Sequence, residues 1–430
     1  MSKMESLLNA KYQWFVNSES GNKIPGTTEY SVPQNLHSII DVVTPTTTLF
    51  DTIRPSVAHN NGARAAAGAT VTPNYIKSTY NVDYNATGNS LVASTGFINI
   101  GASHSDFRAF GQKYVPGLKD FKDVSVNGGN NNGDGSTLEG NLDTQYIGGV
   151  ASPLQSEYLA VGPPGSDADS FNDALLALAN YLNNNSNPPS VVSTSYGIEE
   201  RSIDQSYAQP VCYEFMKAGS RGVSIFFSSG DYGVGGNGES SCSSGYYGLF
   251  PGSCPYITSV GGTSFETNGE VVADFSKYSN AKSPGGGYSE IFTAPDYNKA
   301  VTQAYARTLN SAQQQRLNAN NRGYPDISLV SLLYQVDVSG SDKSVLGTSA
   351  SSPAVAALFG LLNDYRQSKG QPNIGFANPL LYSSKVKPAL RDITSGANKG
   401  CDSNGLPAKS GWDAASGLGS FDFAKLRQLV

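Results

Sequence analysis

The chain of 430 residues is 38% hydrophobic and 15% charged, which is typical of a folded globular protein and excludes a largely disordered one. Its formal net charge of −6, with no block of lysine and arginine, argues against nucleic acid as the main partner. Because no run of about 18 apolar residues occurs, a membrane-spanning helix is excluded as well.

The first 55 residues predict a small separate unit, with a helix over residues 3–11 and a strand over 12–16. The N-terminus lacks the apolar core of a signal peptide. Residues 54–72 are rich in alanine, glycine and asparagine without periodicity, so we expect an exposed linker that a protease could cut.

Beyond the linker, short apolar runs alternate with helical stretches, the pattern of an α/β fold built on a parallel sheet. The expected strands span residues 96–100, 191–196, 223–227 and 256–260. The expected helices span residues 138–150, 170–183, 204–218 and, as a buried helix, 350–367. A hairpin is expected over 265–275, with its turn at Asn268-Gly269.

A serine stands at the start of the last of these helices, in Gly347-Thr348-Ser349 with Pro353 shortly after. Small residues before the serine and a proline just inside the helix place Ser349 at a helix N-terminus, where free N–H groups can stabilise an oxyanion. Ser349 is therefore a candidate nucleophile. The alternative is an ordinary helix cap rich in serine and threonine.

A serine nucleophile needs a base, and histidine is the usual one. His37 and His59 lie in the N-terminal unit and the linker. His104 lacks the glycine and threonine neighbours that accompany the histidine of subtilisin-type enzymes, and we interpret it as an ordinary loop histidine. A Ser-His mechanism is therefore not favoured.

Carboxylates offer another base. Glu139 and Asp143 are four residues apart and share one face of a predicted helix, where their mutual repulsion favours a shared proton. The alternative is a capping box formed by Ser136 and Glu139, with Asp143 simply solvated. Asp231 follows an apolar strand directly and could donate to an oxyanion if protonated, the alternative being an aspartate that caps a turn.

A cluster near the C-terminus contains Asp392 and Asp413 among glycines, and its oxygens could form a calcium site, although ordinary loops often contain such residues. The four cysteines form no C-x-x-C pair, so two disulfides are expected if the protein is exported. Glycosylation sequons at Asn85 and Asn184 fit export.

Together these motifs resemble the sedolisin, or serine-carboxyl peptidase, family, which includes tripeptidyl-peptidase I and many fungal secreted members. The resemblance covers nearly the whole chain. Glu139 to Asp143 resembles the family's Glu-x-x-x-Asp helix, Ser228-Ser229-Gly230-Asp231 its oxyanion aspartate, and Gly347-Thr348-Ser349 with Pro353 its nucleophile motif. Supporting matches occur at residues 191–197, 250–255, 260–263 and 322–326.

The resemblance implies a subtilisin-like parallel sheet flanked by helices and a peptidase that acts at acid pH. Ser349 would be the nucleophile, and Glu139 the general base and later the general acid. Asp143 would orient Glu139 and share its proton. Protonated Asp231 would join the Ser349 N–H in the oxyanion hole.

The resemblance also implies one structural calcium ion, held by the carboxylates of Asp392 and Asp413 and the main-chain carbonyls of Ile393, Lys409 and Gly411. By alignment with the family it suggests the disulfide pairs Cys242–Cys401 and Cys212–Cys254.

By the same resemblance, residues 1–55 are the C-terminal part of an activation pro-domain, which would act on its own peptidase as inhibitor and chaperone. Residues 56–72 would be the linker with the processing site, and residues 73–430 the peptidase domain with the calcium loop. A full pro-domain is longer and would follow a signal peptide, so we expect this sequence to begin inside a precursor.

We expect a secreted monomer that hydrolyses peptides and proteins, with no nucleic-acid or membrane partner. A vacuolar or lysosomal location is the alternative. Tripeptidyl aminopeptidase is the favoured activity. The alternatives are a sedolisin-type endopeptidase and a catalytically silent secreted binding protein on the same scaffold.

Overall fold

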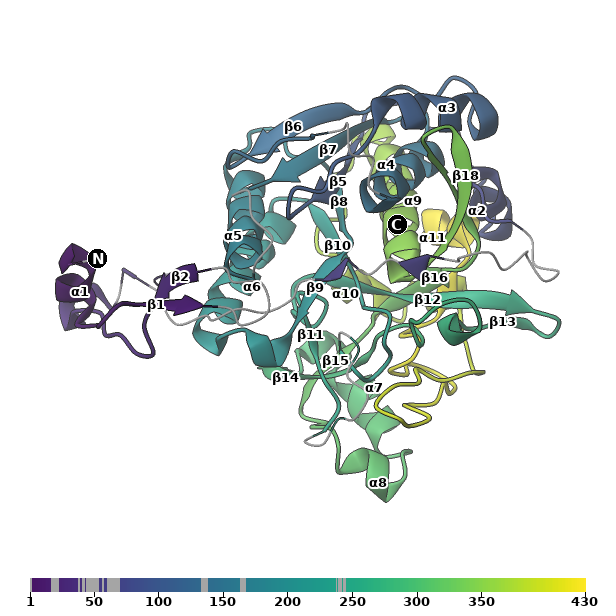
Figure 1. The fold of residues 1–430 in the computed structure, drawn as a ribbon. Coiled ribbons are helices and arrows are strands. Elements are labelled where there is room, and N and C mark those ends of the chain that lie inside the picture. Colours follow the sequence, from purple (N-terminus) through teal and green to yellow (C-terminus); the bar gives the residue numbers. More distant parts are fainter. Residues whose placement is uncertain are drawn as a thin grey trace.

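The computed structural model describes residues 2–16, 23–37, 39–40, 43, 54–55, 58–59, 70–132, 138–162, 168–236, 238, 242 and 245–430. Within them, a twisted sheet lies between two layers of helices, and a small N-terminal unit lies to one side of this body (Figure 1). The predicted α/β architecture is confirmed.

The central sheet has eight strands in the order β13-β12-β10-β8-β5-β7-β6, with β16 also paired to β12. All of these pairs are parallel except β12 with β13. The strands are β5 (Leu91–Gly96), β6 (Lys122–Val126), β7 (Gln155–Val161), β8 (Val191–Thr194), β10 (Ser224–Ser228), β12 (Thr258–Glu266), β13 (Gly269–Val272) and β16 (Ile327–Val330). Their inner strands are buried on both faces, as expected for a parallel sheet covered by helices.

Helices cover both faces of the sheet (Figure 1). One layer contains α2 (Pro73–Thr79), α3 (His104–Tyr114), α4 (Leu138–Ala151) and α9 (Thr348–Ser368), and the other contains α5 (Ala168–Asn184) and α6 (Gln205–Ser220). The first seventeen residues of α9, through Asp364, are all buried, because this helix lies at the centre of the larger apolar cluster and packs against α4, β8 and β10. Small and apolar residues on every side suit such a position.

The remaining elements lie at the edges of the body or in the N-terminal unit. The helices are α1 (Ser2–Leu8), α7 (Asp296–Ala306), α8 (Ser311–Gln314), α10 (Asn378–Leu381) and α11 (Phe423–Leu429). The strands are β1 (Gln13–Val16), β2 (Lys23–Gly26), β3 (Arg54–Pro55), β4 (Ala58–His59), β9 (Tyr196–Glu199), β11 (Leu249–Phe250), β14 (Gly287–Thr293), β15 (Asn321–Tyr324), β17 (Tyr334–Val338), β18 (Ser341–Leu346), β19 (Leu390–Arg391) and β20 (Ser420–Phe421).

Some predicted boundaries are wrong. The strand expected at 96–100 is β5, which ends at Gly96, because the chain turns through positive φ at Ile98 (50°) and Asn99 (61°). The strand expected at 191–196 is interrupted at Ser195, between β8 and β9. The predicted N-terminal helix ends at Leu8, because Asn9 has a φ of 45°. Strands β6, β7 and β16 of the central sheet were not predicted.

The linker expected at 54–72 lies mostly outside the described residues. Its last part belongs to the body of the protein rather than to an exposed segment. Val71 is buried and its N–H donates to the carbonyl of Leu333, and the Thr72 side chain caps the start of α2.

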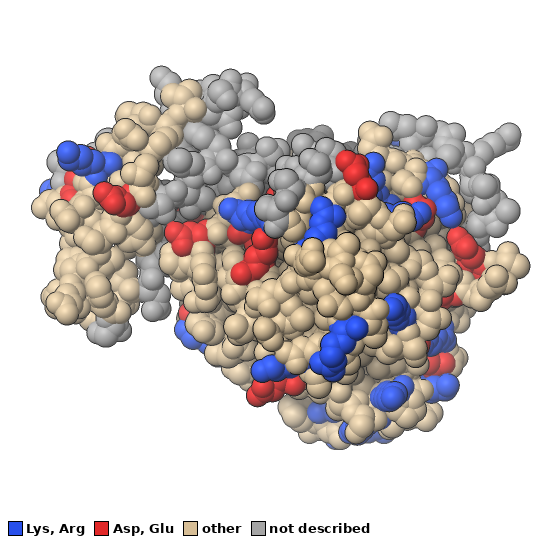
Figure 2. Space-filling model, turned by 90° about the horizontal axis from the view of Figure 1, so that it is seen from below, with Lys and Arg blue, Asp and Glu red and all other residues tan. Residues whose placement is uncertain are grey.

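Two disulfides join Cys212 to Cys254 and Cys242 to Cys401, as the alignment suggested. Among the described residues, no helix is long and apolar enough to cross a membrane. Figure 2 shows acidic and basic side chains interspersed on one face of the molecule, among larger uncharged areas. This face therefore offers no broad patch of a single charge sign to a polyanion.

Candidate active site

Ser349 is the second residue of α9, which begins immediately after β18 and Gly347. Gly347 has a φ of 132°, a backbone conformation that residues other than glycine rarely adopt. The Ser349 hydroxyl is buried and has no hydrogen-bond partner, and no described residue accepts a hydrogen bond from its N–H. The helix-cap interpretation is therefore wrong, because Gly347 is the N-cap and the Ser349 hydroxyl caps nothing.

Glu139 and Asp143 lie one turn apart on α4, which packs against α9. Both side chains are buried, so the interpretation of Asp143 as a solvated residue is wrong. Between them, Gly140 allows close packing, since a Cβ there would lie 2.1 Å from the carbonyl oxygen of Gly101. Ser136 lies outside the described residues, so the capping box stays untested.

The two carboxyl groups are strongly perturbed by their surroundings. Burial raises the pKa of Glu139 well above its ordinary value, and the Asp143 carboxylate raises it further. The nearby Ser349 hydroxyl acts in the opposite direction on the Glu139 pKa, although the two groups do not form a complete hydrogen bond here. Burial also raises the pKa of Asp143. Two such neighbours share protons rather than ionise independently.

Asp231 follows the end of β10 and reaches across to α9. Its Oδ1 accepts the Thr348 N–H at 2.7 Å and the Thr348 hydroxyl at 2.9 Å, whereas its buried Oδ2 has no partner. The turn-cap interpretation is therefore wrong, because the side chain bonds to another element. Burial raises the pKa of Asp231 to about 7, and the two Thr348 donors lower it in part. Asp231 is thus mainly protonated at acid pH.

The structure brings all four predicted side chains to one place, because α4, which carries Glu139 and Asp143, packs against α9, which carries Ser349. Asp231 bonds to Thr348, the residue before Ser349. Each of the four has a buried polar oxygen with no partner. Buried polar atoms are almost always hydrogen-bonded, so such a group of exceptions indicates a functional site. A hydroxyl, an acid-base pair and a neutral acid donor are together the components of acyl transfer.

This chain is similar to known proteins in sequence and in fold. Residues 1–49 match the family model for the Pro-kumamolisin activation domain. The chain is 31% identical over 479 residues to tripeptidyl-peptidase SED2 of Arthroderma otae, and 33% identical over 483 residues to tripeptidyl-peptidase sed4 of Aspergillus fumigatus. Each match covers 99% of this chain and 78% of the relative. Pseudomonas sedolisin, a serine-carboxyl proteinase, matches in structure with a TM-score of 0.67 and 25% identity, over 84% of this chain and 98% of sedolisin.

This chain belongs to the sedolisin family. It is a serine-type peptidase of the serine-carboxyl class, with a subtilisin-like fold and an N-terminal segment that matches the activation domain. The family resemblance inferred from the ordered motifs is confirmed.

Ser195 is a residue of this sedolisin-family site that the sequence analysis did not single out as functional. It lies between β8 and β9, and its hydroxyl donates to Asp143 Oδ1 at 2.8 Å. The same hydroxyl is 3.4 Å from the carbonyl oxygen of Ser349. The only signal in the sequence was its place in the matching stretch at 191–197, which does not separate Ser195 from its neighbours.

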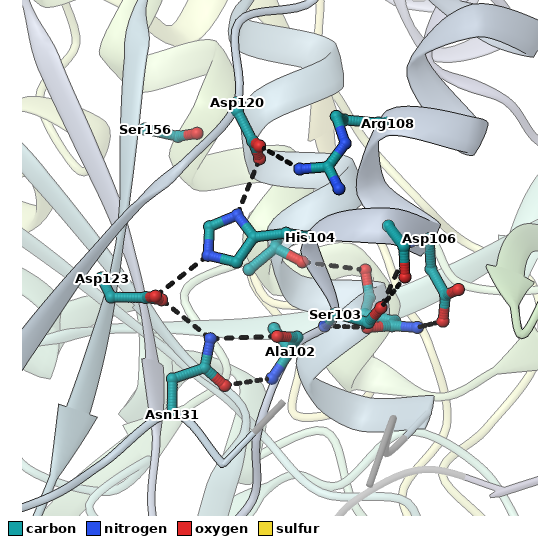
Figure 3. Close-up of polar contacts among 12 residues, drawn as sticks. Ala102, Ser103, His104, Asp106, Arg108, Asp120, Asp123, Asn131 and Ser156 are labelled. Atoms are coloured by element: carbon teal, nitrogen blue, oxygen red, sulfur yellow. Dashed lines mark hydrogen bonds and ion pairs between the residues drawn. The ribbon is translucent and has the colours of Figure 1, made fainter. Parts of the chain in front are cut away.

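His104 is the first residue of α3, so its assignment to a loop is wrong. Its Nδ1 is 2.9 Å from Asp120 Oδ1 and its Nε2 is 2.9 Å from Asp123 Oδ2. Figure 3 shows the ring of His104 in contact with both carboxylates. Both ring nitrogens are thus engaged by carboxylates. Figure 3 also shows Asn131 joining Asp123 to the main chain of Ala102.

Of the other two histidines, the structure describes the side chain of His37 alone. His37 contacts the carbonyl oxygen of Val32 through Nε2 at 2.7 Å in the N-terminal unit. The side chain of His59 lies outside the described residues.

The C-terminal cluster contains oxygens suited to a cation. The carboxylate of Asp413 is buried and accepts the Lys409 N–H at 2.9 Å, while Asp392 is exposed and accepts the Gly411 N–H at 2.9 Å. Within the described residues, the main-chain carbonyls of Ile393, Lys409 and Gly411 accept no hydrogen bond. The described residues contain no group of three or more His, Cys, Asp or Glu side chains that could hold a metal ion. A cation in this cluster would therefore depend on these main-chain carbonyls.

Proposed function

We propose that this chain is an acid-acting peptidase that removes tripeptides from the N-terminus of peptides and proteins, with Ser349 as nucleophile. The observation that carries the proposal is the unpartnered Ser349 hydroxyl, buried beside a pair of carboxyl groups whose pKa values are raised by burial. The names of the fungal relatives support the tripeptidyl specificity.

In the first step, Ser349 Oγ attacks the carbonyl carbon of the substrate while Glu139 takes the hydroxyl proton. Glu139 then gives this proton to the leaving amine, so the peptide bond breaks and an acyl-enzyme remains. In the second half, Glu139 takes a proton from water, which attacks the acyl carbon, and returns a proton to Ser349. Asp143 orients Glu139 and shares its proton in both halves.

The carbonyl oxygen becomes negative when the tetrahedral intermediate forms. The Ser349 N–H and the protonated Oδ2 of Asp231 would donate to it. Neither group has a competing partner among the described residues, which supports this role. Because Asp231 has a pKa of about 7, its donor would be lost above neutral pH.

The segment ahead of the peptidase domain suggests how a substrate binds. β3 pairs antiparallel with β9, and β4 pairs antiparallel with β18, the strand that leads to Ser349. Extended peptides commonly bind by adding a strand to an exposed edge. We propose that substrates pair with β9 and β18 in the same way, and that the processing bond lies between Pro55 and Ala58.

The processing proposal has a direct test. N-terminal sequencing after acid incubation should give a mature chain that begins at Ser56, Val57 or Ala58. A single mature start after residue 60 would contradict this placement without affecting the catalytic residues.

One structural calcium ion would be held by the carboxylates of Asp392 and Asp413 and the carbonyls of Ile393, Lys409 and Gly411. Calcium prefers six to eight oxygen ligands, which these five and one or more waters can supply. Bound there, the ion would stabilise the C-terminal loop without taking part in the reaction.

We further propose that the protein is secreted as a monomer and glycosylated. The asparagines of both sequons, Asn85 and Asn184, are exposed. The two disulfides support an oxidising destination.

The decisive experiment compares wild type with Glu139→Ala and Ser349→Ala in cleavage of a protein substrate at about pH 4. Both variants should lose activity by at least about a thousandfold. Glu266→Gln is the matched control, because Glu266 is an exposed carboxylate paired with Lys277. Unchanged proteolysis by Ser349→Ala would contradict Ser349 as the nucleophile, whereas a wild type that cleaves nothing would support the binding protein. Release of tripeptides from a peptide with a free N-terminus, but not from a blocked one, separates exopeptidase from endopeptidase.

A further inference from the structure

Thr348 connects the carboxyl group of Asp231 to the nucleophile helix. It is the first residue of α9, its side chain is fully buried, and both its N–H and its hydroxyl lie within hydrogen-bond distance of Asp231 Oδ1. We propose that Thr348 is a positioning residue that keeps the proton of Asp231 on Oδ2. This inference rests on the proposed role of Asp231 in the oxyanion hole.

The geometry of Oδ1 carries the argument. A neutral carboxyl group holds its proton on one of its two oxygens. The hydroxyl oxygen of a neutral carboxyl group is a weaker acceptor than its carbonyl oxygen, and Oδ1 faces the Thr348 N–H at 2.7 Å, a group that can only donate. The Thr348 N–H therefore favours Oδ1 as the unprotonated, accepting oxygen. The proton is left to Oδ2, which is buried and has no partner.

The hydroxyl of Thr348 is itself held in place. The Gly230 N–H donates to Thr348 Oγ1 at 3.1 Å, which leaves the hydroxyl hydrogen for Asp231 Oδ1 at 2.9 Å or the Gly230 carbonyl at 3.0 Å. These bonds join the end of β10 to the start of α9. Because Ser349 is the next residue, Thr348 sets the position of both proposed oxyanion donors, the Asp231 Oδ2–H and the Ser349 N–H.

A positioning role has a pH signature that a purely structural role lacks. The Thr348 donors favour the ionised form of Asp231 and so lower its pKa, against the effect of burial. The charged neighbour across the site is the Glu139–Asp143 pair of α4. Removing the Thr348 hydroxyl should thus make catalysis slower while the activity extends to higher pH.

The experiment measures kcat and KM against pH for the acid-activated full chain and its Thr348→Val and Thr348→Ser variants. Thr348→Val should lower kcat by about ten- to a hundredfold, with KM within about twofold, and move the alkaline limb upward by about half a pH unit or more. Thr348→Ser, which keeps the hydroxyl, should restore most of kcat and the original limb. If Thr348→Val does not fold, Thr348→Ala removes the same hydroxyl.

Ser351→Ala is the matched control, because its buried hydroxyl lies in the same helical turn but contacts only main-chain carbonyls, those of Gly261 and Thr348, and no carboxyl group. It should lower the thermal midpoint and leave the alkaline limb in place. A readout independent of activity is infrared titration of the Asp231 carboxyl band in a Ser349→Ala background. Adding Thr348→Val there should move the titration of this band to higher pH.

Two results with a folded Thr348→Val variant would overturn the proposal. One is a kcat equal to that of wild type. The other is a lower kcat with no upward shift of the alkaline limb or of the infrared titration. Asp231→Asn separates this failure from a failure of the proposed function. If Asp231→Asn keeps the activity and alkaline limb of wild type, the oxyanion role itself is wrong. If Asp231→Asn is inactive and Thr348→Val leaves the limb unmoved, only the role of Thr348 is wrong.

Discussion

The Ser195 hydroxyl donates a hydrogen bond to Oδ1 of Asp143 at 2.8 Å, from the point where β8 ends and β9 begins. This contact parallels the one between Thr348 and Asp231 on the other side of the site. In both, a hydroxyl from a neighbouring element occupies one carboxyl oxygen and leaves the other without a partner. Oδ2 of Asp143 thus remains available for the proton shared with Glu139.

Removing the Ser195 hydroxyl should raise the pKa of Asp143 further, because this hydrogen bond lowers it against the effect of burial. We expect Ser195→Ala to lower kcat by about tenfold and to move the acid limb of the pH-rate profile to higher pH. The control is Ser193→Ala, whose buried hydroxyl contacts that of Ser352 rather than a catalytic carboxyl group. An acid limb identical to that of wild type would contradict a role for Ser195.

Asp231 should make both activity and stability depend on pH. Its pKa is about 7 in the folded protein and about 4 in an unfolded chain, so the folded state binds the proton more tightly. Its contribution to stability is therefore fully present below about pH 4 and is lost as the pH rises to about 7.

Asp231→Asn cannot ionise and should show a smaller fall in the free energy of unfolding between about pH 4 and pH 7 than wild type. It should also lose about a hundred- to a thousandfold in kcat, since an amide is a weaker donor to an oxyanion than a carboxyl group. Denaturant unfolding at several pH values measures the first effect. Equal pH slopes for the two proteins would show that Asp231 does not titrate in this range.

Chelation should destabilise the protein if calcium occupies the C-terminal cluster. A ligand that binds only the folded state at about a hundred times its Kd contributes roughly 2.7 kcal/mol, so EDTA should lower the thermal midpoint by several degrees. Asp413→Asn should abolish this response, whereas Asp402→Asn, at an exposed position of a neighbouring loop, should retain it. If EDTA left the thermal midpoint of wild type unchanged, the proposed calcium site would be wrong.

His104 should stabilise the fold only at acid to neutral pH. Partial burial by itself lowers the pKa of His104, but the hydrogen bonds to Asp123 and Asp120 outweigh this effect and raise it. The stabilisation is therefore complete below about pH 6.5 and is lost as the pH rises through the folded-state value. Because the three side chains are about one-third to one-half exposed, the effect should not exceed about 1 kcal/mol.

His104→Gln should accordingly be less stable than wild type at about pH 5 and nearly as stable at about pH 9. The thermal midpoint of both proteins across this range is the measurement. The ring of His104 stacks on Phe121. If the two thermal midpoints differed by the same amount at every pH, His104 would stabilise the fold through this packing and not through its charge.

The sequence by itself determined the family, the parallel sheet and the four proposed catalytic residues. Local sequence patterns predict functional residues well where the chemistry depends on residues close together in the chain. Examples are the four-residue step from Glu139 to Asp143 and the small residues before Ser349. The order of these motifs along the chain then identified one family. The structure placed all four side chains together.

Only the tertiary structure decided which groups hold these carboxyl groups in place. Ser195 and Thr348 are 52 and 117 residues from the aspartates they contact, and no local pattern links such pairs. The pKa values likewise depend on burial, which the fold creates by packing α4 against α9. Short sequence spacing determines which side chains share a helix face. The environment that shifts the pKa values of these side chains arises from contacts between residues far apart in the chain.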